Sequence, residues 1–180
     1  MTGYRTLSSR FIYQGHTIRL RVDDVALPSG QKTVREIIEH DGAVVIVAID
    51  EENHVLLVRQ FRHAAGKNLL ELPAGGIDPG ETPEMTARRE MQEETGYIPE
   101  SLRCLGGFYS APGYASEYLH LFLATGLSPS RLIADDTEEI KLVRLSLSQA
   151  RELILTGQIQ DAKTIAGLLF YFEFKNSSNP

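Results

Sequence analysis

Residues 75–97, GGIDPGETPEMTARREMQEETGY, restrict the fold of this chain more than any other segment, because they carry the start and stop signals of one helix. Thr82 suits the N-cap, where a hydroxyl accepts a hydrogen bond from a backbone N–H of the first turn, and Pro83 suits the first helical position. Gly96 supplies the left-handed conformation that ends a helix. The segment therefore predicts a helix over residues 82–95 that follows a glycine-rich loop.

Three glutamates, Glu90, Glu93 and Glu94, stand at positions i, i+3 and i+4 of this predicted helix and project from one side of it. Like charges at this spacing destabilise a helix and raise each other's pKa unless a cation lies between them. Hard divalent ions such as Mg²⁺ take this kind of oxygen ligand. The cluster predicts a metal site, with a solvated acidic helix surface as the alternative.

Apolar runs and turn residues elsewhere predict strands and helices in alternation. Beyond the first forty residues, we expect strands at 43–49, 54–61, 69–72, 102–109, 117–124 and 140–145, and further helices at 148–156 and 161–172. The first two of these strands are joined by a polar turn and predict a hairpin. The interleaving indicates an α/β or α+β fold, in which a mixed β-sheet is covered by helices.

The first forty residues differ from the rest, since they predict only short strands, at 11–13, 17–25 and 32–38, in an antiparallel β meander. Three short strands need a surface to pack on, which is either the main domain or a second subunit. We expect residues 1–40 to form this meander, 41–175 the main domain and 176–180 a disordered tail.

Charge and cysteine content limit the partners and the compartment. The net charge of −6 argues against a broad surface for nucleic acid or an anionic membrane, while small anions remain possible substrates. Cys104 is the single cysteine, which excludes an intrachain disulfide and suits a reducing compartment. The sequence shows no signal peptide and no apolar stretch long enough to span a membrane, so we expect a cytoplasmic protein.

The spacing of Gly75, Glu81 and residues 89–96, REMQEETG, resembles the Nudix box, with every invariant position filled. One departure is mild: Tyr97 stands where an aliphatic residue is usual, and it still supplies an apolar side chain. The resemblance implies a Nudix fold, a mixed sheet between helices. It also implies an enzyme that hydrolyses a nucleoside diphosphate linked to another group.

The resemblance assigns roles to individual residues of the box. It implies that Mg²⁺, or Mn²⁺, is held by Glu90 and Glu94 as principal ligands, with the Ala74 carbonyl contributing from the loop. Glu93 is implied as an additional ligand or as a residue behind the ligands. Arg89 would orient the carboxylates through charge-assisted hydrogen bonds, the alternative being an ordinary surface pair with Glu93. Arg89 and Glu93 thus belong to the expected catalytic set.

A second segment, YSAPGY at residues 109–114, is similar to the Ser-Pro-Gly segment of the ADP-ribose pyrophosphatases, a Nudix subgroup. Ala111 replaces the usual serine, while Pro112 and Gly113 keep the loop geometry expected of a substrate-binding loop. A simple proline turn is the alternative. Residues 59–62, 71–75 and 161–164 also look like this subgroup, and the match runs from about Arg35 to Phe172.

Four charged residues complete the substrate site that the resemblance implies. Arg62 is the candidate for gripping a phosphate, because a guanidinium matches phosphate oxygens with two parallel hydrogen bonds; a solvated strand-end arginine is the alternative. Glu71 either holds the box loop or touches the substrate. The subgroup pairs two subunits through its N-terminal strands, which implies a homodimer whose Arg35 and Glu36 contact the adenosine part. An exposed Arg and Glu at a strand end would look the same in sequence.

The general base is expected in the acidic stretch before residue 140, since family members of this type carry a glutamate on the corresponding loop. Glu138 matches best, and Asp136 and Glu139 are close substitutes. An acidic run of this kind is otherwise a solvated loop.

These features lead to one expected function and two rivals. The leading hypothesis is Mg²⁺-dependent hydrolysis of the pyrophosphate bond of ADP-ribose to AMP and ribose 5-phosphate. The nearest rival is hydrolysis of another nucleoside diphosphate sugar, such as GDP-mannose. The other rival is a non-catalytic nucleotide-sensing module, although such modules tend to lose the box carboxylates that this chain retains.

Overall fold

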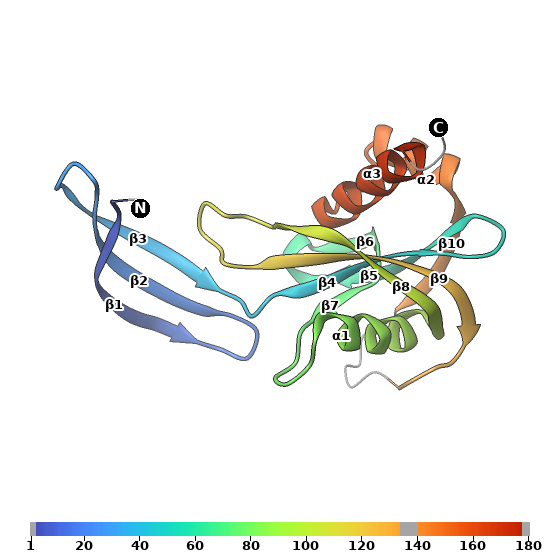
Figure 1. Ribbon diagram of the computed structural model, residues 1–180, viewed down its shortest axis with the longest axis horizontal. Helices are drawn as coiled ribbons and strands as arrows, with labels where there is room; N and C mark the ends of the chain where they lie inside the picture. The colour runs from blue at the N-terminus through green and yellow to red at the C-terminus, as the bar shows by residue number, and fades with distance from the viewer. Residues whose placement is uncertain (1–2, 134–139, 178–180) are drawn as a thin grey trace. The chain divides into compact units, whose positions relative to one another are not determined.

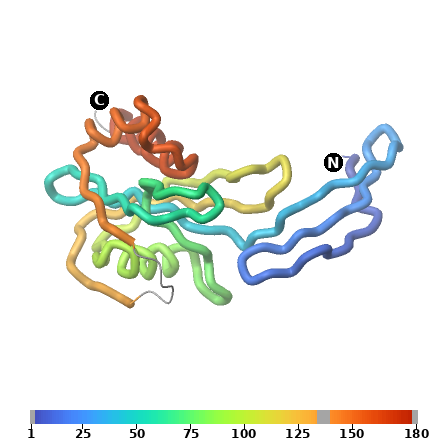
Figure 2. Tube along the Cα trace, turned by 180° about the vertical axis from the view of Figure 1, so that it is seen from behind, coloured from blue at the N-terminus to red at the C-terminus, as the bar shows by residue number. Residues whose placement is uncertain are grey.

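The computed structural model describes residues 3–133 and 140–177, which divide into two compact units. The first unit takes Met1–Gly42 and Tyr109–Tyr118, and the second takes Ala43–Phe108 and Leu119–Pro180. Figures 1 and 2 trace the chain through both. The chain therefore leaves the second unit once, between two of its strands, to add a loop to the first.

The first unit contains the predicted antiparallel meander, in the order β1-β2-β3. Its strands are β1 (Arg5–Gln14), β2 (Arg19–Ala26) and β3 (Lys32–Glu39). β1 is much longer than the predicted residues 11–13, because its pairing with β2 extends back to Arg5, opposite Ala26. The added residues, RTLSSR, are mostly polar and gave no strand signal, and every residue of β1 is exposed.

The inserted loop is tied to the end of β3 by backbone hydrogen bonds. The Ile38 N–H donates to the Tyr114 carbonyl at 2.8 Å, and the Ser116 N–H donates to the Ile38 carbonyl at 2.9 Å. The Ser116 hydroxyl also accepts from the His40 N–H at 3.0 Å. These bonds fix the loop against the strand that carries Arg35 and Glu36.

The second unit is built on a mixed sheet, as predicted. The strands are β4 (Ala43–Ile49), β5 (His54–Arg62), β6 (Lys67–Glu71), β7 (Ala74–Gly76), β8 (Tyr97–Tyr109), β9 (Tyr118–Pro129) and β10 (Lys141–Ser146). The main order is β10-β5-β4-β9-β8, with β6 on β5 and β7 on β4. β4 runs antiparallel to β5, which confirms the hairpin, and parallel to β9. Residues 74–76 were expected in a loop, but they pair with β4.

Helices cover both faces of this sheet (Figure 1). α1 (Pro83–Glu90) and η2 (Met91–Thr95) lie on one side, α2 (Leu147–Leu155) and α3 (Ala162–Ser177) lie on the other, and η1 (His63–Ala65) is a short connection. Because both faces are covered, all seven residues of β4 are buried. Val45 and Val47 join one apolar core with Leu168 of α3.

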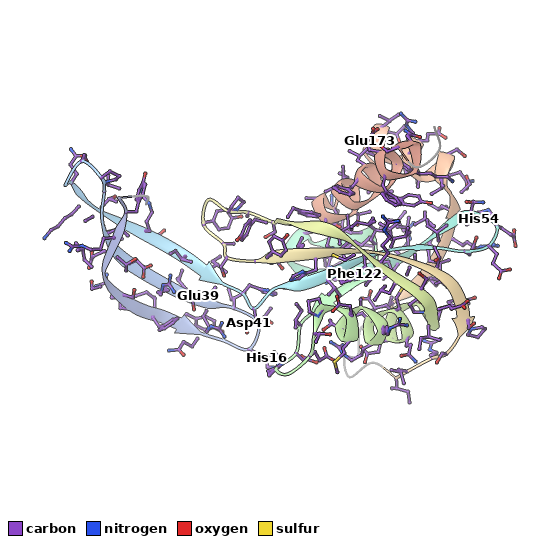
Figure 3. The ribbon with its side chains drawn as sticks, in the orientation of Figure 1. His16, Glu39, Asp41, His54, Phe122 and Glu173 are labelled. Atoms are coloured by element: carbon purple, nitrogen blue, oxygen red, sulfur yellow. The ribbon has the colours of Figure 1, made fainter. Side chains whose placement is uncertain are left out.

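The alternate residues of β4 belong to a second apolar core on the opposite face. Val44 and Ile46 pack there with Met91 and with Phe122, which Figure 3 labels. Fully burying such a side chain contributes about 1.5–3 kcal/mol. The box helix is therefore anchored to the centre of the sheet, and its acidic side is held in a defined place.

The box helix has the predicted ends but an altered last turn. The Thr82 hydroxyl accepts from the Met85 N–H at 3.3 Å, and Gly96 takes a left-handed conformation with φ 78°. Between them the helix is α-helical only to Glu90 and then continues as a π-helical turn, where a uniform α-helix was expected. Such turns occur as single insertions, frequently at functional sites.

The carboxyl-terminal helices begin at side-chain caps. Ser146 and Gln149 form a capping box at the start of α2, and the Thr164 N–H donates to Asp161 Oδ2 at the start of α3. α3 ends at Ser177, beyond the predicted residue 172. No helix within the described residues is long and apolar enough to cross a bilayer.

Candidate active site

Arg89 lies at the centre of the box and ties together three glutamates. Its Nε and Nη2 atoms donate to the two carboxylate oxygens of Glu81 at 2.9 and 3.0 Å. Its Nη1 atom donates to Glu90 Oε1 at 2.6 Å and to Glu93 Oε2 at 3.1 Å. The guanidinium is therefore bonded to all three carboxylates, and these bonds include the pair with Glu93 that formed the alternative.

Glu81 is the residue that sequence reasoning left without a role. Besides its two bonds from Arg89, it accepts from the Thr86 hydroxyl at 2.7 Å. The hydrogen bonds from Arg89 are the main reason that the pKa of Glu81 falls to about 2. A carboxylate that remains charged in this way holds Arg89 from the side opposite Glu90 and Glu93. The sequence signal that could have indicated this pair is the presence of a glutamate and an arginine in the same motif, since a carboxylate and a guanidinium can form two parallel hydrogen bonds.

Glu90 is packed against the glycine-rich strand. It is only 9% exposed, and burial raises its pKa, an effect that Arg89 opposes. A Cβ added at Gly75 would stand 2.0 Å from the Glu90 carboxylate carbon. The position must therefore be glycine so that the carboxylate can lie against the backbone.

Glu94 is held by the same segment. Its Oε2 accepts from the Ala74 N–H at 3.0 Å. Burial raises the pKa of Glu94 to about 8, and the nearby Glu90 carboxylate adds to the rise. Two acids are thus confined where their charges repel each other, beside the backbone of residues 74–76.

The donor set suits a hard divalent cation. As the side chains stand, no three His, Cys, Asp or Glu residues of the described chain are arranged as a ready metal site, and Arg89 bonds to Glu90 and Glu93. The pKa values of Glu90 and Glu94 are nevertheless raised, because the cationic side chains near them do not offset the effect of burial, and a bound cation would lower these pKa values. Oxygen ligands of this type are those of Mg²⁺ and Mn²⁺. The residues therefore fit a cation held by Glu90, Glu93, Glu94 and the Ala74 carbonyl.

A second charged cluster adjoins the box. Glu71 is 1% exposed and accepts from Arg62 through Nε at 2.8 Å and Nη2 at 2.8 Å, and also from the Lys163 ammonium of α3. Burial alone would raise the pKa of Glu71, but the two cations lower it overall. Both cations also oppose the rise in the pKa of Glu94, so the two clusters influence each other.

This arrangement refines the expectations for Arg62 and Glu71. Arg62, expected to grip a phosphate, here forms a two-bond pair with Glu71. Glu71 lies next to the box loop and is too buried to present a wide surface to a ligand. Lys163 was not expected in the site, because 92 residues separate it from Glu71.

In the first unit, the structure brings four expected substrate residues together. Arg35, Glu36, Pro112 and Gly113 line one pocket of about 410 Å³, with Arg21 and Tyr114 among the other lining residues. A volume of this size lies within the range of small-molecule sites. The pocket exists because the loop is hydrogen-bonded to the end of β3. The expected base, Glu138, and its substitutes Asp136 and Glu139 lie outside the described residues.

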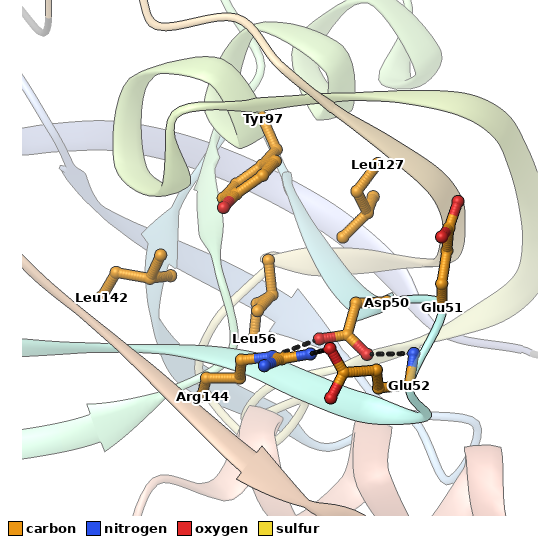
Figure 4. Close-up of a pocket in the computed structure, with 8 residues that line it drawn as sticks. All are labelled: Asp50, Glu51, Glu52, Leu56, Tyr97, Leu127, Leu142 and Arg144. Atoms are coloured by element: carbon orange, nitrogen blue, oxygen red, sulfur yellow. Dashed lines mark hydrogen bonds and ion pairs between the residues drawn. The ribbon is translucent and has the colours of Figure 1, made fainter.

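A pocket of about 370 Å³ in the second unit was not expected from the sequence (Figure 4). It is lined by the β4–β5 turn, by Leu142 and Arg144 of β10, and by Tyr97. Arg144 bonds to Asp50 and, at 3.0 Å, to Glu52, which ties the turn to the sheet edge. These contacts give Asp50 and Arg144 a structural role.

Comparison with known proteins gives two family matches. Residues 39–168 match the model described as NUDIX domain. Residues 4–38 match the model described as nucleoside diphosphate sugar hydrolase N-terminal domain. The two matches meet at the end of β3.

Individual proteins resemble the chain over nearly its whole length. A methanol dehydrogenase activator of Bacillus methanolicus is 40% identical, covering 92% of this chain and 91% of its own. An ADP-ribose pyrophosphatase of Bacillus subtilis (strain 168) is 38% identical, covering 96% and 94%. A crystal structure of an ADP compounds hydrolase superposes with a TM-score of 0.87 at 25% identity, covering 98% and 96%.

Proposed function

The chain belongs to the Nudix family of hydrolases, and we propose that it cleaves the pyrophosphate bond of ADP-ribose to give AMP and ribose 5-phosphate. The observation that carries the proposal is the assembled box, in which Arg89 gathers Glu81, Glu90 and Glu93 beside Glu94 and the backbone of residues 74–76. The choice of substrate is supported by the relatives that act on ADP-ribose and ADP compounds.

Nudix hydrolases generally use divalent metal ions, and we propose Mg²⁺, with Mn²⁺ as a substitute. A bound divalent ion would supply positive charge to the pyrophosphate oxygens and lower the pKa of a coordinated water. Glu90, Glu93, Glu94 and the Ala74 carbonyl would hold it. Arg89 keeps the carboxylates oriented, and the Ala74 N–H fixes Glu94.

The reaction is a hydrolysis in which water attacks one phosphorus atom. The bond from that phosphorus to the bridging oxygen breaks, and the bridging oxygen leaves with the other phosphate. We propose that Glu138 accepts the proton that the attacking water loses, with Asp136 and Glu139 as substitutes for this role. We assign phosphate binding to Arg62, which is held by Glu71 and has 39% of its side chain exposed.

Substrate recognition is assigned to the pocket of the first unit. Arg35 and Glu36 present charged groups there, and Pro112 and Gly113 shape the facing loop. The match of residues 4–38 to an N-terminal domain of nucleoside diphosphate sugar hydrolases supports a role of this unit in binding such a substrate. The exposed apolar side chains of Phe11, Ile12 and Tyr13 in β1 support a homodimer, and the single exposed thiol of Cys104 suits the cytoplasm.

The direct test is to incubate the purified protein with ADP-ribose and MgCl₂ and to follow AMP and ribose 5-phosphate by chromatography. EDTA should abolish turnover and added Mg²⁺ should restore it. Glu94→Gln should lower kcat by more than about a hundredfold, since loss of a residue behind a metal ligand alone costs about 10- to 100-fold. Glu84→Gln, an exposed acid in the first turn of the same helix, should leave kcat unchanged.

The same experiment separates the rivals. Turnover of GDP-mannose without AMP release from ADP-ribose would replace the proposed substrate with another nucleoside diphosphate sugar. Binding of ADP-ribose with no turnover of any member of a nucleotide-sugar panel would favour a sensor.

A further inference from the structure

The first turn of α3 is bonded directly to the segment that leads into the box. Thr164 is fully buried, and its hydroxyl accepts from the Leu72 N–H at 2.8 Å. The same hydroxyl donates to Asp161 Oδ2 at 2.5 Å. A hydroxyl has one hydrogen to donate, and here Asp161 accepts it. A lone pair of the Thr164 oxygen is therefore available to accept from the Leu72 N–H. Asp161 is itself fixed by the Thr164 N–H and by Lys163.

Leu72 matters because its neighbour is a proline. Pro73 has no N–H, so Leu72 and Ala74 provide the only backbone donors of residues 72–74. Leu72 donates to Thr164, and Ala74 donates to Glu94. The Pro73 carbonyl is held from the other side by the Ile46 N–H at 2.9 Å. The position of the Ala74 N–H is thus set by two contacts of the preceding residues. Thr164 holds the N–H of Leu72, and β4 holds the carbonyl of Pro73.

Packing of α3 does not by itself require this hydroxyl. Leu168 and Tyr171 already bury the helix in the apolar core, and Gly167 lets it approach Leu72 so closely that a Cβ there would stand 2.7 Å from the Leu72 side chain. A valine of the same shape would fill the same space, but it would leave the buried Leu72 N–H without an acceptor. The hydroxyl is therefore explained by the two bonds that it makes, one donated to Asp161 and one accepted from the Leu72 N–H.

We propose that Thr164 is a positioning residue of the metal site, which acts through the Leu72 N–H to place the Ala74 backbone and Glu94. The inference rests on the proposed function for the identity of the site, but its primary test needs no substrate. It predicts that removal of the hydroxyl weakens metal binding, while removal of the methyl group does not.

The experiment measures Mn²⁺ binding by electron paramagnetic resonance, from the signal of the free ion, for wild type and three variants. Thr164→Val should raise the dissociation constant for Mn²⁺ on the order of tenfold, as for other residues behind metal ligands. Thr164→Ser, which keeps the hydroxyl, should bind as wild type does. Phe172→Ala weakens the packing of the same helix eight residues beyond Thr164, without removing a hydrogen bond to Leu72, and should also leave Mn²⁺ binding unchanged. Thermal unfolding of each variant defines the temperature at which all are folded.

Three outcomes would overturn the inference: wild-type Mn²⁺ affinity in Thr164→Val, weakened affinity in Thr164→Ser, or an equal loss in Phe172→Ala. The serine variant tests the idea even where the valine variant does not fold. Wild-type protein that binds Mn²⁺ but leaves ADP-ribose intact would refute the proposed substrate alone. Hydrolysis of ADP-ribose by a Thr164→Val variant with unchanged Mn²⁺ affinity would refute the positioning role alone.

Discussion

At the scale of single residues, the site depends on two neighbouring glycines that differ in the space around them. A Cβ at Gly75 would meet the Glu90 carboxylate, whereas a Cβ at Gly76 would have no atom within 4 Å. Neither residue has a positive φ, so backbone strain does not distinguish them. The difference between alanine variants at the two positions therefore measures how closely Glu90 must approach the backbone.

We expect Gly75→Ala to displace Glu90 and to weaken Mn²⁺ binding and kcat by about 10- to 100-fold, the range for disturbed metal surroundings. Gly76→Ala should leave both within about twofold of wild type, because an unobstructed methyl group leaves the ligands undisturbed. Isothermal titration with Mn²⁺ and steady-state kinetics with ADP-ribose measure the two effects. Equal losses in both variants would show that flexibility of the strand, rather than the contact with Glu90, is required.

The pair of Glu81 and Arg89 makes a prediction about pH. Folding lowers the pKa of Glu81 from 4.5 to about 2, so its charged form stabilises the folded protein above pH 4.5, and this contribution is lost as the pH falls toward 2. Glu81→Gln should therefore lower the free energy of unfolding at pH 7, with the difference from wild type shrinking between pH 4.5 and pH 2. Urea unfolding at several pH values checks this.

The matched control for that series is Glu84→Gln, an exposed acid three residues further along the chain. It should change the free energy of unfolding little at any pH, since exposed charges contribute little. A difference between wild type and Glu81→Gln that stays constant from pH 7 to pH 2 would contradict the assigned pairing.

At the scale of elements, features that depend on neighbouring residues could be predicted from the sequence, whereas contacts between residues far apart in the chain could not. Thr82 and Gly96 mark the helix ends because capping depends on residues within one turn. The pair of Lys163 and Glu71 joins residues 92 positions apart, and β7 forms only because β4 pairs with it. Residues 74–76, AGG, carry no strand preference of their own, so only the folded sheet reveals them as a strand. The candidate box was visible in sequence, while its supporting contacts were not.

The capping box of α2 gives a test at this scale. Ser146 Oγ accepts from the Gln149 N–H at 3.2 Å, and Gln149 Oε1 accepts from the Ser146 N–H at 2.9 Å. Ser146→Ala should lower the free energy of unfolding by about 1 kcal/mol, a typical value for loss of an N-cap. The mutation lies away from the box, so kcat for ADP-ribose should not change. Denaturant unfolding measures the first quantity, and an unchanged midpoint would contradict the role of the cap.

At the scale of the whole molecule, the first unit exposes apolar residues that a monomer has no evident use for. Phe11, Ile12 and Tyr13 of β1 are 47%, 55% and 57% exposed. Ile12 falls at an irregularity in the pairing with β2, where Phe11 and Tyr13 have partners on β2 and Ile12 has none among the register pairs of the described strands. An apolar side chain presented in this way favours contact with another protein surface, and the proposed occupant is a second copy of this chain.

Ile12→Asp should therefore convert a homodimer into a species with the chain mass of 20.0 kDa, because a buried unpaired carboxylate is costly at an interface. Light scattering coupled to size exclusion measures the mass, and circular dichroism checks that the strands remain. Leu155→Asp, at an 80% exposed leucine of α2, is the matched control and should leave the mass unchanged. If the dimer also completes the nucleotide pocket, KM for ADP-ribose should rise in Ile12→Asp alone. A wild-type mass equal to one chain at micromolar concentration would leave β1 without the proposed partner and would contradict the homodimer.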